Sequence, residues 1–322
     1  MMRVAVLDDY QEAALRLADW ASLHPKAQIE SINRHIADED ALVKRLHVFE
    51  AVVAMRERTP FPAGLFARLP NLKLLVTSGM RNAAIDLEAA TTHGVTVCGT
   101  DMLATPTAEL AWGLILGLCR SIPFEDRAMR EGKWQTTLGF GVHGKTLGIV
   151  GLGKLGGQMA RVGKAFGMEV VAWSQNLTAD LAAAAGARLV AKNELFTMAD
   201  IVTVHLVLSE RTRGVIGAAE LKRMKPTAFI VNTARGPIID EAALIEALET
   251  RRIAGAAIDV YSSEPLPADH KLRRLPNTVL TPHLGYVTGE NYRQAYGQAV
   301  EDIAAFLAGA PIRVLAAPAK AG

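Results

Sequence analysis

The sequence places an arginine, a glutamate and a histidine shortly after three apolar runs, and these residue types suit the chemistry of a small carboxylic acid. They are Arg235, Glu264 and His283. An arginine offers a planar fork that binds a carboxylate bidentately. A histidine holds and releases a proton near neutral pH, and a carboxylate beside it favours the imidazolium and orients the ring. We predict that Arg235 binds the carboxylate and carbonyl of a 2-oxo acid. During reduction His283, supported by Glu264, would donate a proton to the carbonyl oxygen.

Each of these residues also has a structural interpretation. A lone histidine after a strand usually makes a structural hydrogen bond, and Arg235 and Glu264 could form a surface pair. Their joint placement favours the functional interpretation, because ligands of open α/β sheets bind outside the carboxyl ends of the strands.

A glycine-rich turn precedes these residues in the chain. Gly151-Leu-Gly153-Lys-Leu-Gly156 follows the apolar run Thr146–Val150 and opens a helical pattern from Lys154 to about Phe166. In a strand–turn–helix, the first glycine permits the tight turn, the second lets the backbone approach a pyrophosphate, and the third lets the helix pack on the strand. The helix N-terminus favours an anion. We predict a dinucleotide site, although a glycine turn without function and another nucleotide such as a methyl donor stay open. The candidate contacts are Gly151, Gly153, Lys154, Leu155 and Gly156.

The next strand carries the residue that normally selects the cofactor. The run Glu169–Trp173 ends in Ser174, where an Asp or Glu would bind the ribose hydroxyls and repel a 2′-phosphate. No Arg or Lys follows closely, the next being Arg188. Ser174 therefore leaves NAD and NADP both open.

Other strand ends supply further candidate cofactor contacts. They are His205, Thr233, Ala234, Asp259 and His283 itself. Asp259 is expected near the nicotinamide. For His205 a structural role is favoured, because its neighbours Leu206 and Val207 look like core.

These residues would be positioned by two series of alternating strands and helices. This alternation predicts an α/β fold with two doubly wound parallel-sheet domains. Expected strands in the first series are Val4–Leu7, Ala51–Ala54, Leu72–Val76 and Val95–Cys98, with helical segments at Gln11–Trp20 and Leu42–Leu46. The second series has expected strands at Thr146–Val150, Glu169–Trp173, Ile201–His205, Phe229–Val231, Gly255–Ile258 and Val279–Leu280. Expected helices are Glu109–Arg120 opened by Thr105-Pro106, Glu241–Thr250 capped by Asp240, and Glu290–Leu307.

Length and composition agree with a globular protein of two domains. At about 150 residues per domain, 322 residues suggest two domains. The net charge of +2 and the interspersed signs indicate no nucleic-acid or membrane partner. The apolar run Leu110–Cys119 is too short to span a bilayer. Asp8 and Asp9 interrupt any signal-peptide core. Cys98 and Cys119 form no metal or disulfide pattern, so we expect no metal site and two reduced thiols in the cytoplasm.

Taken together, the motifs resemble those of the D-isomer-specific 2-hydroxyacid dehydrogenases over nearly the whole chain. The matching segments are GLGKLG from Gly151, LKRMKPTAFIVNTARGPIIDEAAL from Leu221, AGAAIDVYSSEPLP from Ala254 and TPHLG from Thr281. The resemblance implies an NAD(P)-dependent oxidoreductase that interconverts a 2-oxo acid and a D-2-hydroxy acid, with Arg235, Glu264 and His283 as its catalytic three.

The resemblance also implies an architecture. Residues 100–287 would form a Rossmann-type NAD(P)-binding domain inserted into a flavodoxin-like substrate domain of residues 1–99 and 288–322, with a cleft that closes on substrate. Arg56 and the backbone around Ser78 and Gly79 match the family's substrate loops, although Arg56 and Arg58 could be solvated loop charges. A homodimer formed through the cofactor domain and a slight preference for NAD over NADP are further family expectations.

Some residues depart from the family pattern. Ser174 stands where many members have Asp, Val207 where Pro is common, and Tyr286 and Val287 where small residues are frequent. Glu264 stands where formate dehydrogenases have Gln, which disfavours formate. We regard Tyr286, Trp134 and Met80 as candidate pocket residues or plain packing. The alternatives are a short phosphoglycerate dehydrogenase, phosphite oxidation, and, from another class, a dinucleotide-sensing binding protein like the corepressors of this fold.

Overall fold

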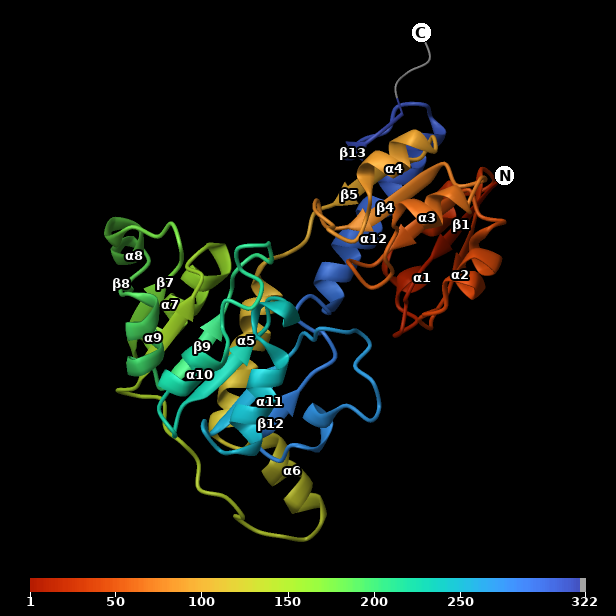
Figure 1. Ribbon diagram of the computed structural model, residues 1–322. Helices are drawn as coiled ribbons and strands as arrows, with labels where there is room; N and C mark the ends of the chain where they lie inside the picture. The colour runs from red at the N-terminus through yellow and green to blue at the C-terminus, as the bar shows by residue number, and fades with distance from the viewer. Residues whose placement is uncertain (319–322) are drawn as a thin grey trace. The chain divides into compact units, whose positions relative to one another are not determined.

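The computed structural model describes residues 1–318, and the chain divides into two units (Figure 1). The N-terminal unit comprises Met1–Leu103 and the chain from Val287 onward, and the central unit is Ala104–Tyr286. The sequence predicted cuts after residues 99 and 287, and the structure divides after Leu103 and Tyr286.

The N-terminal unit is built on a six-stranded sheet in the order β13-β5-β4-β3-β1-β2. Its strands are β1 (Met2–Val6), β2 (Ala27–Ser31), β3 (Ala51–Ala54), β4 (Leu74–Ser78), β5 (Thr96–Thr100) and β13 (Val314–Ala316). Strands β1 to β5 are parallel and follow the flavodoxin-like order 2-1-3-4-5. The predicted parallel sheet is confirmed by these five strands, and β13 adds an antiparallel pairing with β5 at one edge.

Helices cover this sheet. They are α1 (Ala14–Leu17), η1 (Trp20–Leu23), α2 (Glu39–Leu46), α3 (Ala63–Ala67), α4 (Leu87–Thr92) and α12 (Gly289–Leu307). The predicted helix Gln11–Trp20 is wrong in extent. Glu12 has a φ of 51°, in the left-handed region, so the chain turns there before α1 begins. The side chain of Asp9 accepts the N–H groups of Ala13 and Ala14 at this turn.

The central unit is built on a seven-stranded, wholly parallel sheet in the order β12-β11-β10-β9-β6-β7-β8. Its strands are β6 (Thr146–Val150), β7 (Glu169–Trp173), β8 (Arg188–Leu189), β9 (Ile201–Val204), β10 (Phe229–Asn232), β11 (Gly255–Ile258) and β12 (Thr278–Leu280). Counted from β6, this is the Rossmann order 3-2-1-4-5-6 with one added strand. The strand order reverses between β6 and β9, where such sheets bind dinucleotides.

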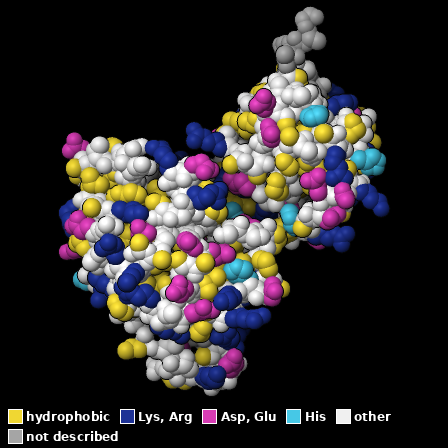
Figure 2. Space-filling view, in the orientation of Figure 1, with side chains coloured by type: hydrophobic (Ala, Val, Ile, Leu, Met, Phe, Trp, Pro, Cys, Tyr) yellow, Lys and Arg dark blue, Asp and Glu magenta, His cyan; other side chains and the backbone are white. Residues whose placement is uncertain are grey.

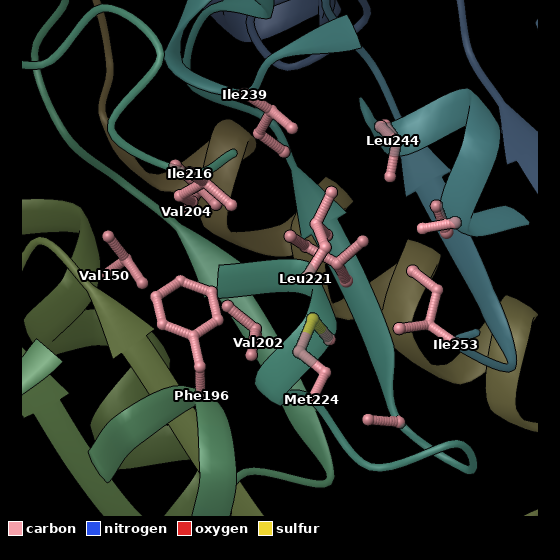
Figure 3. Packing of buried hydrophobic residues seen from close by; sticks show 14 of the residues in the cluster. Val150, Phe196, Val202, Val204, Ile216, Leu221, Met224, Ile239, Leu244 and Ile253 are labelled. Atoms are coloured by element: carbon pink, nitrogen blue, oxygen red, sulfur yellow. The ribbon is translucent and has the colours of Figure 1, made fainter. Parts of the chain in front are cut away.

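Both faces of the central sheet are buried. Neighbouring residues of one strand enter different clusters: Val150 and Ile230 pack with Phe196, whereas Ile149 and Val231 pack with Met159. Figure 3 shows the first cluster, with Phe196 lying next to Val150 and Val202. The covering helices are α5 (Thr105–Cys119), α6 (Ile122–Arg130), α7 (Lys154–Ala165), α8 (Ala179–Ala184), α9 (Lys192–Met198), α10 (Ala218–Arg223), η2 (Gly236–Ile238), α11 (Glu241–Glu249) and η3 (Lys271–Arg274). The predicted cap of α11 is confirmed, since Asp240 accepts the N–H of Ala243 at 3.1 Å.

Figure 2 shows basic and acidic side chains interspersed over the visible face. Within residues 1–318, no helix is long and apolar enough to cross a membrane, and no group of His, Cys, Asp and Glu side chains could hold a metal ion. Cys98 and Cys119 are free and buried, and burial raises the pKa of each thiol to about 12.

Candidate active site

The glycine turn joins β6 to α7 and has the geometry of a phosphate cradle. Gly151 has a φ of +102°, and a Cβ there would lie 2.7 Å from the carbonyl carbon of His205. A Cβ on Gly156 would overlap the carbonyl oxygen of Gly151, so helix and strand require a glycine there. Gly153 differs from both, because a Cβ at this position would meet no described atom within 4 Å. The open space beside Gly153 is where a pyrophosphate would approach the backbone, so the residues present fit a dinucleotide.

Gly153 also caps α7, without any side-chain hydrogen bond. The N-cap residue of this helix therefore supplies no side-chain acceptor to the first N–H groups, a place that an anion can take. Lys154 is exposed and Leu155 half-buried at the same turn.

Two buried polar side-chain atoms without a hydrogen-bond partner in the described part of the chain follow the neighbouring strands β9 and β10. His205 and Thr233 follow the paired residues Val204 and Asn232 of β9 and β10. Nδ1 of His205 and Oγ1 of Thr233 are buried and have no hydrogen-bond partner among the described residues. Buried polar groups of proteins are normally hydrogen-bonded, so these atoms suit contact with a bound ligand.

The other ring nitrogen of His205 lies 2.8 Å from the hydroxyl of Thr203. Burial lowers the pKa of His205 to about 4, so the ring is neutral near pH 7. The expectation that both Leu206 and Val207 belong to the core is partly wrong. Leu206 does pack on the core, but Val207 is 78% exposed because the chain leaves the sheet there.

Ser174 lies half-buried at the end of β7. Sequence reasoning missed a basic residue that packs on Trp173, the last residue of that strand, because Lys192 is distant along the chain. The ammonium of Lys192 lies 5.8 Å from the centre of the Trp173 ring. This charge is already paired, since it lies 2.8 Å from Oε1 of Glu220 and also donates to the carbonyl of Val215.

Arg235 is held on a short loop by the residue that ends β10. The amide of Asn232 accepts the N–H of Ala234 and donates to the carbonyl of Arg235, both at 3.0 Å. The half-buried guanidinium of Arg235 donates to the carbonyl of Ala234 at 2.7 Å. Gly236 follows, and a Cβ there would overlap the backbone of Tyr261. The Arg235 loop is thereby packed on the segment that leads to Glu264.

Glu264 and His283 form a direct pair. Oε2 of Glu264 lies 2.6 Å from Nδ1 of His283, and Oε1 accepts the N–H of Tyr261 at 2.9 Å. The glutamate is therefore anchored at one oxygen and holds the imidazole with the other.

The backbone from His283 to Gly285 is hydrogen-bonded to Asp259. His283 has a φ of 54°, and its N–H donates to the carbonyl of Asp259. The buried carboxylate of Asp259 accepts from the hydroxyl of Thr281 and the N–H groups of Leu284 and Gly285. Burial raises the pKa of Asp259, while these donors oppose that rise.

The predicted substrate loop of the N-terminal unit is assembled at the ends of β3 and β4. Arg56 donates its N–H to the hydroxyl of Ser78 at 2.8 Å and its guanidinium to the carbonyl of Ser78 at 3.4 Å. A Cβ on Gly79 would overlap this guanidinium, so Arg56 requires a glycine there. Sequence reasoning missed two residues of this loop. Asn82 donates to the carbonyl of Arg56, and Glu57 lies 3.6 Å from the guanidinium.

Arg58 is not a solvated loop charge. Its guanidinium donates to the carbonyl of Asp8 at 2.7 Å and lies 4.6 Å from the centre of the Tyr10 ring. The carboxylate of Asp8 is buried and pairs with His35 and Thr59. The Asp8–Asp9 pair directly after the first strand was the signal for this cluster.

The three candidate pocket residues differ in burial. Tyr286 is buried, Met80 is partly exposed, and Trp134 is exposed among residues that follow α6.

A Rossmann sheet with a glycine cradle and a histidine–glutamate pair at its carboxyl edge defines a dinucleotide-binding domain of the dehydrogenase kind. Residues 112–285 match the family model described as "D-isomer specific 2-hydroxyacid dehydrogenase, NAD binding domain". The chain belongs to the D-isomer specific 2-hydroxyacid dehydrogenase family, as its motifs predicted.

Similar proteins carry several names. The chain is 37% identical to a D-3-phosphoglycerate dehydrogenase of Bacillus subtilis, over 88% of this chain and 54% of that protein. It is 35% identical to a glyoxylate reductase of Korarchaeum cryptofilum, over 83% and 82% of the two chains. The crystal structure of a phosphoglycerate oxidoreductase from Vibrio cholerae matches with 37% identity and a TM-score of 0.92, over 96% and 100% of the two chains. The chain spans about half the length of the first phosphoglycerate dehydrogenases it matches.

Proposed function

We propose that this protein interconverts a D-2-hydroxy acid and its 2-oxo acid with a nicotinamide dinucleotide. The observation that carries the proposal is the 2.6 Å contact between Nδ1 of His283 and Glu264, at the sheet edge that also bears the glycine cradle. A histidine oriented by a carboxylate is a suitable acid–base group for a carbonyl and its alcohol.

Different residues of the protein would bind the substrate, transfer the proton and bind the dinucleotide. The bound dinucleotide supplies or accepts the hydride. Glu264 engages Nδ1 of His283, so Nε2 is the atom proposed to exchange a proton with the substrate oxygen. Arg235 would bind the substrate carboxylate, and Arg56, Ser78 and Gly79 are kept as proposed substrate contacts from the N-terminal unit. The proposed dinucleotide contacts remain the five residues of the glycine turn with Ser174, His205, Thr233, Ala234, Asp259 and His283.

For the cofactor we propose that NAD is used at least as well as NADP. Ser174 provides no carboxylate to repel a 2′-phosphate, and the nearby Lys192 is neutralised by Glu220. The side chains around this strand end therefore give neither form a strong electrostatic advantage.

The substrate class is tested by a panel. Glyoxylate, hydroxypyruvate, phenylpyruvate and 3-phosphohydroxypyruvate would each be reduced with NADH and with NADPH, and kcat/KM compared. Turnover of at least one is expected, with glyoxylate and 3-phosphohydroxypyruvate suggested by the relatives' names. Tight dinucleotide binding without turnover of any would contradict the proposal and favour a sensing protein.

We also propose a homodimer formed through the central unit, in the cytoplasm. The residues in and after α6 expose large apolar side chains, including Trp134 at 73% and Leu138 at 100%. Clustered exposed apolar groups are typical of protein interfaces. Light scattering should give twice the chain mass for the wild type and a lower mass for Leu138→Glu, and a wild-type monomer would contradict the dimer.

A further inference from the structure

Tyr286 packs directly on the proposed acid–base histidine. Its ring centre lies 5.2 Å from that of His283, with the two planes at 74°, an edge-to-face arrangement. Tyr286 is only 6% exposed, so it offers little surface to a ligand as a pocket wall.

The turn that carries both residues fixes the tyrosine in place. Gly285, its neighbour, donates its N–H to Asp259 at 2.9 Å and accepts from the hydroxyl of Thr107 at 2.9 Å. A Cβ on Gly285 would lie 3.3 Å from both side chains. The backbone that leads into Tyr286 is therefore held through both polar groups of Gly285, while burial of the tyrosine side chain restricts its ring.

One hydrogen bond does not orient an imidazole completely. The contact with Glu264 fixes one distance at Nδ1, but the side chain can still adjust by rotation about its Cα–Cβ and Cβ–Cγ bonds. A flat, buried ring packed against the imidazole removes that rotation and thereby sets the direction of Nε2. Aromatic pairs in this geometry contribute beyond the area they bury.

We propose that Tyr286 is a positioning residue that fixes the imidazole of His283, so that Nε2 is held in the direction needed for proton transfer. The inference rests on the proposed function of His283. The aromatic ring is the essential part, since it makes the contact with the imidazole.

The test compares substitutions that keep or remove the ring. Tyr286→Phe keeps it and should retain kcat within about threefold. Tyr286→Leu removes it and should lower kcat about 10–100-fold, because small misplacements of reacting groups are costly. The KM for the dinucleotide should change less than about threefold in both. Tyr286→Met, which fills a similar volume without a planar ring, should behave like the leucine variant and replaces it if that variant unfolds.

A second readout does not depend on turnover. With ¹⁵N-labelled histidine, the Nδ1–H resonance of His283, assigned by its loss in His283→Ala, should be sharp in the wild type and in Tyr286→Phe. It should broaden or disappear in Tyr286→Leu. Equal kcat in the leucine variant and the wild type, an equal loss in the phenylalanine variant, or an unchanged resonance would overturn the inference. If the wild type turned over no 2-oxo acid, the proposed function would be contradicted. The resonance would then test separately whether Tyr286 orders the imidazole of His283.

Discussion

The carboxylate of Asp259 holds the turn that bears His283, accepting the N–H of Gly285 at 2.9 Å and that of Leu284 at 2.7 Å. The strand-end aspartate thus supports a histidine whose backbone lies in the left-handed region.

Replacing Asp259 should therefore disturb the histidine before it disturbs the dinucleotide. In Asp259→Asn an amide NH₂ can face one of the N–H donors, and a buried unsatisfied group costs about 1–3 kcal/mol. We expect a lower melting temperature and a kcat reduced more than the dinucleotide Kd is raised. Calorimetry measures the melting temperature, steady-state kinetics measure kcat, and fluorescence titration measures the Kd. An unchanged kcat would contradict this role.

Two glycines of the cradle should respond differently to the same change. Gly156→Ala would overlap the carbonyl of Gly151 and should destabilise the fold by about 1–3 kcal/mol. Gly153→Ala meets open space and should leave the free energy of unfolding nearly unchanged. It should weaken dinucleotide binding about tenfold or more, because the methyl group would occupy the space proposed for the pyrophosphate. Equal dinucleotide affinities in Gly153→Ala and the wild type would argue against the cradle.

The N-terminal unit offers a comparable pair. Gly79→Ala should displace the guanidinium of Arg56 and raise the KM for the 2-oxo acid, without changing the KM for the dinucleotide. Gly94→Ala is the matched control, since Gly94 also has a positive φ, of +74°, and a methyl group there meets no described atom within 4 Å. If both variants kept the wild-type KM for substrate, Arg56 would lose its proposed role.

Asp302 should make stability depend on pH. Burial raises the pKa of this carboxyl to about 7, against the opposing effect of Arg313 at 2.9 Å. The folded state therefore binds the proton more tightly than the unfolded state, whose pKa is near the ordinary value of 3.8. Binding of this proton to Asp302 therefore stabilises the folded state. The contribution to the free energy of unfolding is complete below pH 3.8 and is lost as the pH rises through about 7.

Asp302→Asn lacks this titration. From pH 4 to pH 8, the melting temperature of the wild type should therefore fall relative to that of Asp302→Asn. A difference that stayed constant over this range would contradict the raised pKa.

Much of the central unit could be predicted from the sequence, because its strands are apolar runs bounded by glycines and polar residues. Thr146–Val150 and Gly255–Ile258 have the predicted bounds. The edge strand β13 was missed, because Val314–Ala316 is short and lacks a buried pattern. Helix α6 was missed as well, since most of its residues are exposed and Ala128 is its one buried residue.

Side-chain partners were harder to predict than the elements. Arg58 contacts Asp8, and Lys192 contacts Trp173. The two residues of each pair are far apart in the chain, so only the folded structure shows that they meet. The contact between Glu264 and His283 was predicted, because both follow neighbouring strands of one parallel sheet.

The central claim is that His283 transfers the proton during reduction of a 2-oxo acid. Its most direct test is kcat for the best substrate of the panel, in wild type and His283→Ala, with dinucleotide affinity measured on the same samples. We predict a fall in kcat of about 10²–10⁴-fold, typical for loss of a general acid, with the dinucleotide Kd changed less than about threefold. An unchanged kcat in His283→Ala would contradict the account.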